Sequence, residues 1–155
     1  MTAPARVPPS RLAGPADAGA VAALAQAAYA HYVPRMGRRP APMDADYAAL
    51  IAAGRVHVAE LDGAISGVLV LVPEGETLLL DNVAVAPHAQ GRGIGRALLA
   101  FAEAEARAAG CTAIRLYTNE AMVENIALYG RAGYVETRRG EEAGFRRVHM
   151  EKRLT

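Results

Sequence analysis

Three glycines at alternate positions, Gly91, Gly93 and Gly95, follow an apolar run that ends near Val85. Glycine adopts left-handed backbone conformations readily and carries no Cβ, so this segment can turn its N–H groups toward one point and let another group come close. A helical pattern follows at once, and the first turn of a helix has free N–H groups and a positive dipole end. The segment therefore predicts a strand–loop–helix unit that binds a phosphate or a diphosphate.

Two common phosphate-binding loops do not fit this segment. A Walker loop requires a lysine before its last Ser or Thr, and the segment has no lysine. A Rossmann site has G-x-G-x-x-G in the first strand–helix turn, whereas the spacing here is G-x-G-x-G and the loop lies beyond the middle of the chain. A plain connecting turn remains the alternative, although a connection does not need three glycines in five residues. Arg92 and Arg96 would add positive charge to an anion site.

Apolar periodicity and turn signals divide the chain into helices and strands. Helices are expected over residues 16–33, 44–53, 93–109 and 122–132. Strands are expected over residues 11–13, 56–61, 64–72, 78–85, 112–118, 134–138 and 146–154, the last two paired antiparallel. This order predicts an α+β (mixed α/β) fold, with a mixed sheet and helices on both faces.

Local signals set the expected ends of several elements. Pro34 is expected to end the first helix, and residues 35–43 to form an ordered loop. Asp44 is the expected N-cap of the second helix. Turns are expected at residues 62–63 and 73–75.

Length and composition favour one domain over residues 1–155, with residues 1–9 flexible. The formal net charge is only +1, which argues against nucleic acid or an anionic membrane as partner. Cys111 is the only cysteine, so no internal disulfide can form, and the four histidines lack metal-site spacing. No apolar run approaches the ~20 residues that cross a bilayer. We expect a cytoplasmic protein without a metal. We interpret the arginine pairs at residues 138–139 and 146–147 as solvated residues on strand edges.

The glycine loop and two further segments resemble one family. The pattern Gln90-x-x-Gly93-x-Gly95 resembles the Q/R-x-x-G-x-G/A pyrophosphate loop of the GNAT superfamily of N-acetyltransferases. Residues 81–87 are similar to the strand before that loop, and residues 125–134 to the other cofactor-contacting helix. The order of elements also matches, so the resemblance covers almost the whole chain. It implies a GNAT-like fold, with a central twisted mixed sheet of six to seven strands, splayed central strands and helices on both faces.

The resemblance implies acetyl-coenzyme A as the acetyl donor, with its pantetheine arm between strands 78–85 and 112–118. Backbone groups of the first of these strands would bind the arm like an added strand, and the Val83 N–H would polarise the thioester carbonyl. The residues expected to bind the cofactor are Val83, Ala84, Val85, Gln90, Gly91, Arg92, Gly93, Ile94, Gly95, Arg96 and Asn125.

Two residues are candidates for proton transfer. By the resemblance, the Tyr129 hydroxyl lies near the sulfur of coenzyme A and acts as the general acid. Asp81 falls where many relatives have a glutamate, and it would accept the amine proton directly or through water. The structural alternatives are a core tyrosine and an aspartate that holds a backbone N–H. Asn125 lies one helical turn before Tyr129, but many relatives have their asparagine where this chain has Met122, which leaves the role of Asn125 open.

The acceptor is expected to contact the first two helices and the loop between them, where Met43 and Tyr47 also lie. The residues expected to bind it are Tyr29, Tyr32, Arg35, Arg38 and Asn82. Either of the two arginines would suit an acceptor that carries a carboxylate or a phosphate.

The sequence thus predicts an enzyme that acetylates the primary amine of a small metabolite or amino-acid-like acceptor by direct attack in a ternary complex. Two alternatives stay open, namely acetylation of a protein N-terminus or lysine, and a non-catalytic acetyl-coenzyme A-binding regulatory module. Relatives often form homodimers, so a homodimer is possible.

Overall fold

The computed structural model describes residues 10–154, so the expectation of a flexible segment at residues 1–9 falls outside the described residues. One seven-stranded sheet has the strand order β1-β2-β3-β4-β5-β7-β6. The strands are β1 (Arg11–Leu12), β2 (Val56–Leu61), β3 (Ala64–Glu74), β4 (Thr77–Val85), β5 (Ala113–Asn119), β6 (Val135–Glu142) and β7 (Phe145–Arg153). The pair β4 and β5 is parallel, and the other neighbours are antiparallel. This confirms the predicted mixed α+β fold.

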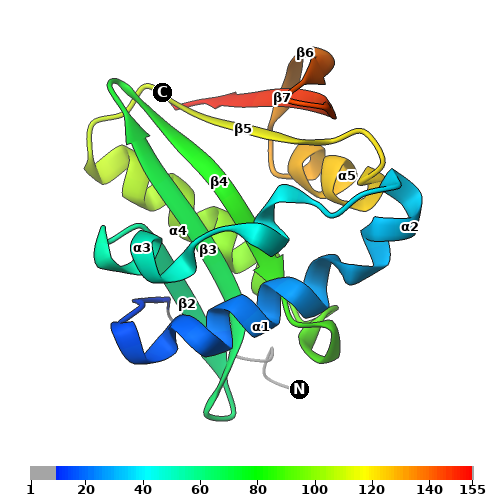
Figure 1. Cartoon of the computed structure of the whole chain (residues 1–155). Helices are drawn as coiled ribbons and strands as arrows, with labels where there is room; N and C mark the ends of the chain where they lie inside the picture. The colour runs from blue at the N-terminus through cyan, green and yellow to red at the C-terminus, as the bar shows by residue number, and fades with distance from the viewer. Residues whose placement is uncertain (1–9, 155) are drawn as a thin grey trace, which may run out of the picture.

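Helices cover both faces of the sheet, with α1 and α3 on one face and α4 on the other (Figure 1). The α-helices are α1 (Ala18–Tyr29), α2 (Val33–Met36), α3 (Tyr47–Ala52), α4 (Ile94–Ala108) and α5 (Val123–Arg131). The 3-10 helices are η1 (Pro15–Asp17), η2 (Ala30–Tyr32), η3 (Ala41–Asp44) and η4 (Pro87–Ala89). Among residues 10–154, no helix has the length and apolar character that a membrane span requires.

The two central strands part halfway along their length. Their ladder runs from Thr77↔Ala113 to Leu80↔Leu116 and stops there. Beyond this point β4 continues to Val85 on β3, while β5 continues to Asn119 on β7. Figure 1 shows β4 (green) and β5 (yellow) together at one end and apart at the other, with α5 beside the opening. The predicted splay of the central strands is therefore present.

A β-bulge lies at the point where the strands part. The register of β3 and β4 moves from Val70↔Asn82 to Leu71↔Leu80, so Asp81 has no partner on β3. The ladder with β5 also ends one residue earlier, at Leu80. Bulges bend a strand and re-aim its side chains, and they are frequent beside active sites.

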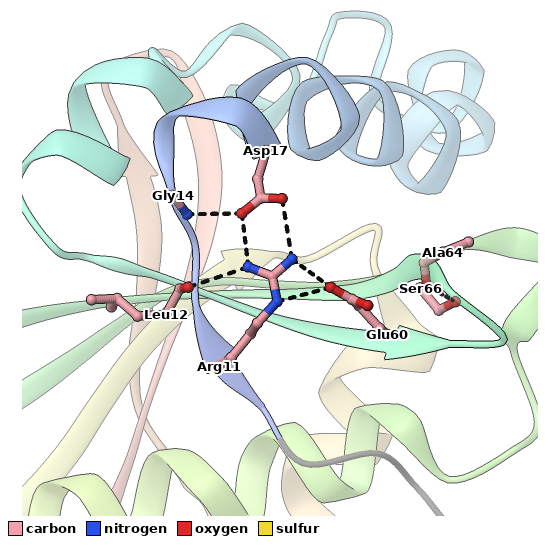
Figure 2. A network of polar contacts seen from close by, with 7 residues as sticks. All are labelled: Arg11, Leu12, Gly14, Asp17, Glu60, Ala64 and Ser66. Atoms are coloured by element: carbon pink, nitrogen blue, oxygen red, sulfur yellow. Dashed lines mark hydrogen bonds and ion pairs between the residues drawn. The ribbon is translucent and has the colours of Figure 1, made fainter.

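The Arg11 guanidinium joins three parts of the N-terminal region (Figure 2). It donates to both carboxylate oxygens of Asp17, at 2.8 and 3.1 Å, and from Nε to Glu60 on β2 at 2.8 Å. The Asp17 carboxylate also accepts from the Gly14 N–H at 2.8 Å. Hydrogen bonds from Arg11 and Gly14 lower the pKa of Asp17 to about 2. The short strand β1 is thus tied to the start of α1 by side chains.

Several predicted boundaries are wrong. Pro34 does not end the first helical segment but occupies the first turn of α2, where a missing N–H costs nothing. The N-cap of α3 is Asp46, which accepts from the Ala49 N–H at 3.0 Å, instead of Asp44 in η3. Strand β3 runs to Glu74 through Pro73, which the sequence assigned to a turn. Strand β6 continues to Glu142, beyond its predicted end at residue 138, and forms a long hairpin with β7 around residues 143–144.

Candidate active site

The glycine loop forms a row of unpaired backbone donors. Gly91 and Gly93 both have φ of +80°, a left-handed conformation that favours glycine, and Gly93 is the N-cap of α4. Within the described chain, no N–H group from Gly91 to Arg96 has a hydrogen-bond acceptor. Arg92 and Arg96 are exposed. Free N–H groups at the start of a 15-residue helix have the geometry to bind an anion.

The side of β4 that no strand covers leads from this loop toward the bulge. On this side, the Val83 carbonyl accepts from the Tyr29 hydroxyl at 3.1 Å, and the Val85 carbonyl accepts from Gln90 Nε2 at 3.5 Å. The Ala86 N–H donates to Ser66 O at 2.9 Å, so the alternation of an antiparallel ladder directs Ala84 toward β3 and leaves Val83 and Val85 facing away from it. Their backbone groups therefore face the gap left by β5. A polar group placed in that gap can pair with them as a neighbouring strand would.

A cavity of about 220 Å³, here the Gly95 cavity, fills this gap between β4, the loop and α5. Its lining includes the predicted residues Tyr29, Tyr32, Val83, Ala84, Val85, Gln90, Gly95 and Asn125. The small Gly95 keeps the wall open, since a Cβ there would lie 3.6 Å from Val85 and 3.7 Å from Leu128. The geometry brings six expected cofactor residues and two expected acceptor residues, Tyr29 and Tyr32, to one cavity.

A second cavity of about 190 Å³, here the Asp81 cavity, lies at the bulge end of the gap. Asp81, Asn82 and Tyr129 line it. Tyr29 and Asn125 line both cavities, so the two spaces adjoin at these residues. The Gly95 cavity therefore borders the region of the two predicted proton-transfer residues.

Asp81 is more than half buried at the mouth of this junction, and burial raises the pKa of its carboxyl. Two effects partly offset this rise in the pKa of Asp81. The Tyr117 hydroxyl donates to Asp81 Oδ1 at 3.2 Å, and the positive charge of Arg147 favours the ionised carboxylate. The Asp81 carboxylate has no backbone N–H partner within the described residues, which removes that structural alternative. A carboxylate with a raised pKa in a cavity has the properties of a general base.

Tyr129 is buried, and its side chain lines the Asp81 cavity. No described residue accepts a hydrogen bond from its hydroxyl or donates one to it. Burial raises its pKa, so the hydroxyl keeps its proton at neutral pH. Its ring meets Tyr134 edge to face at 6.0 Å, which fixes the ring while the hydroxyl stays unpaired.

Asn82 is a buried connection and not an open acceptor contact. Its Oδ1 accepts from the Tyr29 hydroxyl at 2.5 Å, and its Nδ2 donates to the Tyr47 hydroxyl at 3.0 Å. The Tyr47 hydroxyl donates in turn to Pro42 O at 2.5 Å. This chain of bonds fastens α1 and the segment before α3 to the splayed strand.

The other predicted acceptor residues, Tyr32, Arg35 and Arg38, form contacts between the elements around the site. Tyr32 donates to Glu124 at 3.2 Å and Arg35 donates to the same carboxylate at 2.6 Å, which ties α2 to the start of α5. Arg38 donates to Gly144 O at 2.9 Å and lies 3.8 Å over the Phe145 ring. Tyr32 lines the Gly95 cavity, whereas neither arginine lines either cavity.

Sequence reasoning missed Tyr117 and Arg147 among the residues of the Asp81 cavity, whereas Tyr47, which it placed on the acceptor side, does line the cavity. The interpretation of Arg147 as a solvated edge residue is wrong, because β7 lies between β5 and β6 and the side chain is only 19% exposed. Arg138 and Arg139 do lie exposed on the edge strand β6.

In residues 10–154, no cluster of His, Cys, Asp or Glu is arranged to hold a metal ion. The candidate site consists of a row of free backbone N–H groups, a strand edge and a cavity lined by one carboxylate and four tyrosines.

Comparison with known proteins agrees with this geometry. Residues 22–134 match the Acetyltransferase (GNAT) family. A search of curated proteins finds no match. A GCN5-related N-acetyltransferase from Rhodopseudomonas palustris superposes with a TM-score of 0.80 at 23% identity, covering 96% of this chain and 97% of that one.

Two further structures have the same fold. The PaiA N-acetyltransferase from Thermoplasma acidophilum, in complex with coenzyme A, has a TM-score of 0.80 at 17% identity over 94% of this chain and 98% of its own. A ribosomal-protein alanine N-acetyltransferase from Escherichia coli has a TM-score of 0.74 at 20% identity over 95% and 94%. With the family match over most of the sequence, this chain belongs to the GNAT family of acetyltransferases.

Proposed function

We propose that this chain transfers the acetyl group of acetyl-coenzyme A to the primary amine of a small metabolite or amino-acid-like acceptor, by direct attack in a ternary complex. The observation that carries the proposal is the meeting of the two cavities at Tyr29 and Asn125. One cavity leads to the row of free N–H groups, and the other holds Asp81 and Tyr129.

The residues of the gap fit coenzyme A. The N–H groups of residues 91–96 would bind its diphosphate, with Arg92 and Arg96 adding charge. The outward-facing backbone groups of Val83 and Val85 would pair with the amides of the pantetheine arm. When bound, acetyl-coenzyme A supplies a thioester whose carbonyl carbon reacts with a neutral amine.

Each proton of the reaction has a residue to hold it. Asp81, ionised, would accept the proton that the amine loses. Tyr129 would donate its hydroxyl proton toward the departing sulfur, and the Val83 N–H would stabilise negative charge on the carbonyl oxygen. Holding both substrates at the junction of the two cavities supplies much of the rate enhancement.

The size of the Asp81 cavity supports a small acceptor. Its volume of about 190 Å³ is below the ~300–1,000 Å³ of pockets for drug-sized ligands. The segment from Pro40 to Ala45 and the hairpin residue Phe145 contribute to its walls. A protein N-terminus or lysine would require an open groove, so we rank a protein acceptor second.

A test of this proposal is free-thiol release from acetyl-coenzyme A with a panel of small amines and peptides, together with calorimetry of coenzyme A binding. We expect coenzyme A to bind and thiol to be released with small amines. Release with peptides alone would indicate a protein acceptor. Binding without release on any amine would indicate a non-catalytic module and would refute the proposed reaction.

A further inference from the structure

One arginine in the Asp81 cavity, Arg147, has no hydrogen bond from its guanidinium within the described residues. Its side chain is only 19% exposed. Its one ion pair is with Glu142, at 3.7 Å, which is too long for a hydrogen bond. Glu142 also binds His149 at 2.8 Å and Arg138 at 3.0 Å, so its charge is shared among three partners.

Aromatic rings hold this guanidinium in place. Its central carbon lies 4.3 Å from the centre of the Tyr117 ring and 5.6 Å from that of Phe145. Stacking covers the faces of a guanidinium and leaves the N–H donors at its edge free for a planar anion. Placing a cation in a half-buried position without hydrogen bonds costs free energy, which a bound carboxylate would offset.

Arg147 shares its cavity with Asp81, and no ion pair joins the two. The cavity therefore contains one negative and one positive site that do not neutralise each other by contact. Its other walls are largely apolar, with Met36, Pro42 and Leu50 among them. This arrangement complements a small molecule that carries an ammonium group, a carboxylate and an apolar body.

We infer that Arg147 binds a carboxylate of the acceptor, and that the substrates are amines that also carry a carboxylate. The inference rests on the proposed function, because it names the acceptor class of the same site. The sequence predicted that Arg35 or Arg38 would bind an acidic group of the acceptor. In the structure Arg35 binds Glu124 and Arg38 binds the β6–β7 hairpin, so we assign this role to Arg147 instead.

The experiment compares α-, β- and ω-amino acids with apolar side chains, each paired with its primary amide, as acceptors for the wild type and for Arg147→Gln. The amide keeps the amine and the shape but removes the negative charge. For the wild type, we expect the acids to bind better than the amides. In Arg147→Gln, the KM for acids rises about 10- to 100-fold, as expected for a lost charge-assisted hydrogen bond, while the KM for amides and for acetyl-coenzyme A changes little.

Three controls separate the specificity of Arg147 from other effects. Arg146→Gln removes a neighbouring arginine that is exposed and bound to Glu120, and it should keep the preference for acids. Arg147→Lys keeps the charge without the planar fork and should restore part of the preference. The amide has a lower amine pKa than its acid, but this difference is the same with both enzymes. It therefore cancels when the acid-to-amide ratio of Arg147→Gln is divided by that of the wild type, and any change in the pKa of Asp81 cancels within each ratio.

Calorimetry of the same amino acids on the protein saturated with coenzyme A measures their binding without turnover. Binding that is lost in Arg147→Gln supports the inference even if the chemical step fails. Thiol release with amines that lack a carboxylate, and none with amino acids, would overturn the inference and leave the acetyltransferase proposal standing. An unchanged acid-to-amide preference in Arg147→Gln, or equally tight calorimetric binding of the amino acids to wild type and Arg147→Gln, would also overturn it.

Discussion

Replacing Tyr129 by phenylalanine separates a catalytic hydroxyl from a structural one. The hydroxyl lines the Asp81 cavity and has no hydrogen-bond partner among the described residues. Its removal therefore breaks no bond that stabilises the fold. A general acid contributes ~10²–10⁴-fold to the rate, so we expect kcat to fall by about 10²-fold or more with little change in the KM for acetyl-coenzyme A.

The stability of the same variant tests whether the Tyr129 hydroxyl also has a structural role. If the hydroxyl made a hidden structural hydrogen bond, its loss would cost about 1 kcal/mol, or roughly 2–4 °C in Tm for a chain of this length. We expect no such loss, and a small gain is possible because a buried unpaired hydroxyl is itself unfavourable. Thermal unfolding by circular dichroism, beside steady-state thiol release, measures both quantities.

Tyr134→Phe is the matched control. The Tyr134 hydroxyl is buried without a hydrogen-bond partner within the described chain, but the residue does not line the Asp81 cavity. The two rings pack against each other, so both substitutions disturb the same contact. We expect Tyr134→Phe to keep its activity. Full activity of Tyr129→Phe, or an equal loss in both variants, would refute the role of the Tyr129 hydroxyl as acid.

Three further predictions concern the strand and its support. Asp81→Asn should lower kcat/KM by about 10²-fold or more, and yet raise Tm at pH 7. We expect the rise in Tm because burial raises the pKa of Asp81 in the folded state, so ionisation of Asp81 at neutral pH destabilises that state. The neutral Asn side chain removes this cost. A Tm gain at pH 7 that persists below pH ~4, where Asp is protonated in both states, would contradict this. Tyr117→Phe removes a hydrogen bond that lowers the pKa of Asp81. The acid limb of the pH profile of kcat/KM should therefore move to higher pH with the same acceptor. If this limb does not move, Asp81 is not the base. Gly67→Ala should destabilise the fold by about 1–3 kcal/mol in urea unfolding, because the new Cβ would lie 2.8 Å from Ile94 and 2.9 Å from Leu98, and unchanged stability would mean that α4 can shift.

The parts of the site that local sequence determines could be predicted. The left-handed conformations of Gly91 and Gly93 follow from residue type, and the free donors follow from the start of a helix. The place of Asp81 beside the opening followed only from the resemblance to a family, since neither a bulge nor the end of a ladder has a local signal at that residue.

The acceptor side could not be predicted, because sheet order creates it. Arg147 faces Asn119 in the ladder of β5 and β7, which brings it beside Tyr117 and into the cavity of Asp81. No local pattern states that these strands are neighbours. Arg35 looked equally suitable in sequence, but the position of α5 supplies Glu124 as its partner. A charge in the sequence becomes a binding group only where the fold leaves it unpaired.

The most direct test of the central claim is calorimetric titration of coenzyme A into wild type, Gly93→Asp and Gly110→Asp. Both glycines have left-handed φ values, +80° and +75°, and they lie at opposite ends of α4, so both substitutions impose similar backbone strain. Only the first places a carboxylate among the free N–H groups of residues 91–96. The account predicts a loss of affinity of about 100-fold or more for Gly93→Asp and near-normal binding for Gly110→Asp. Equal affinity in all three proteins would contradict the assignment of the loop as the diphosphate site.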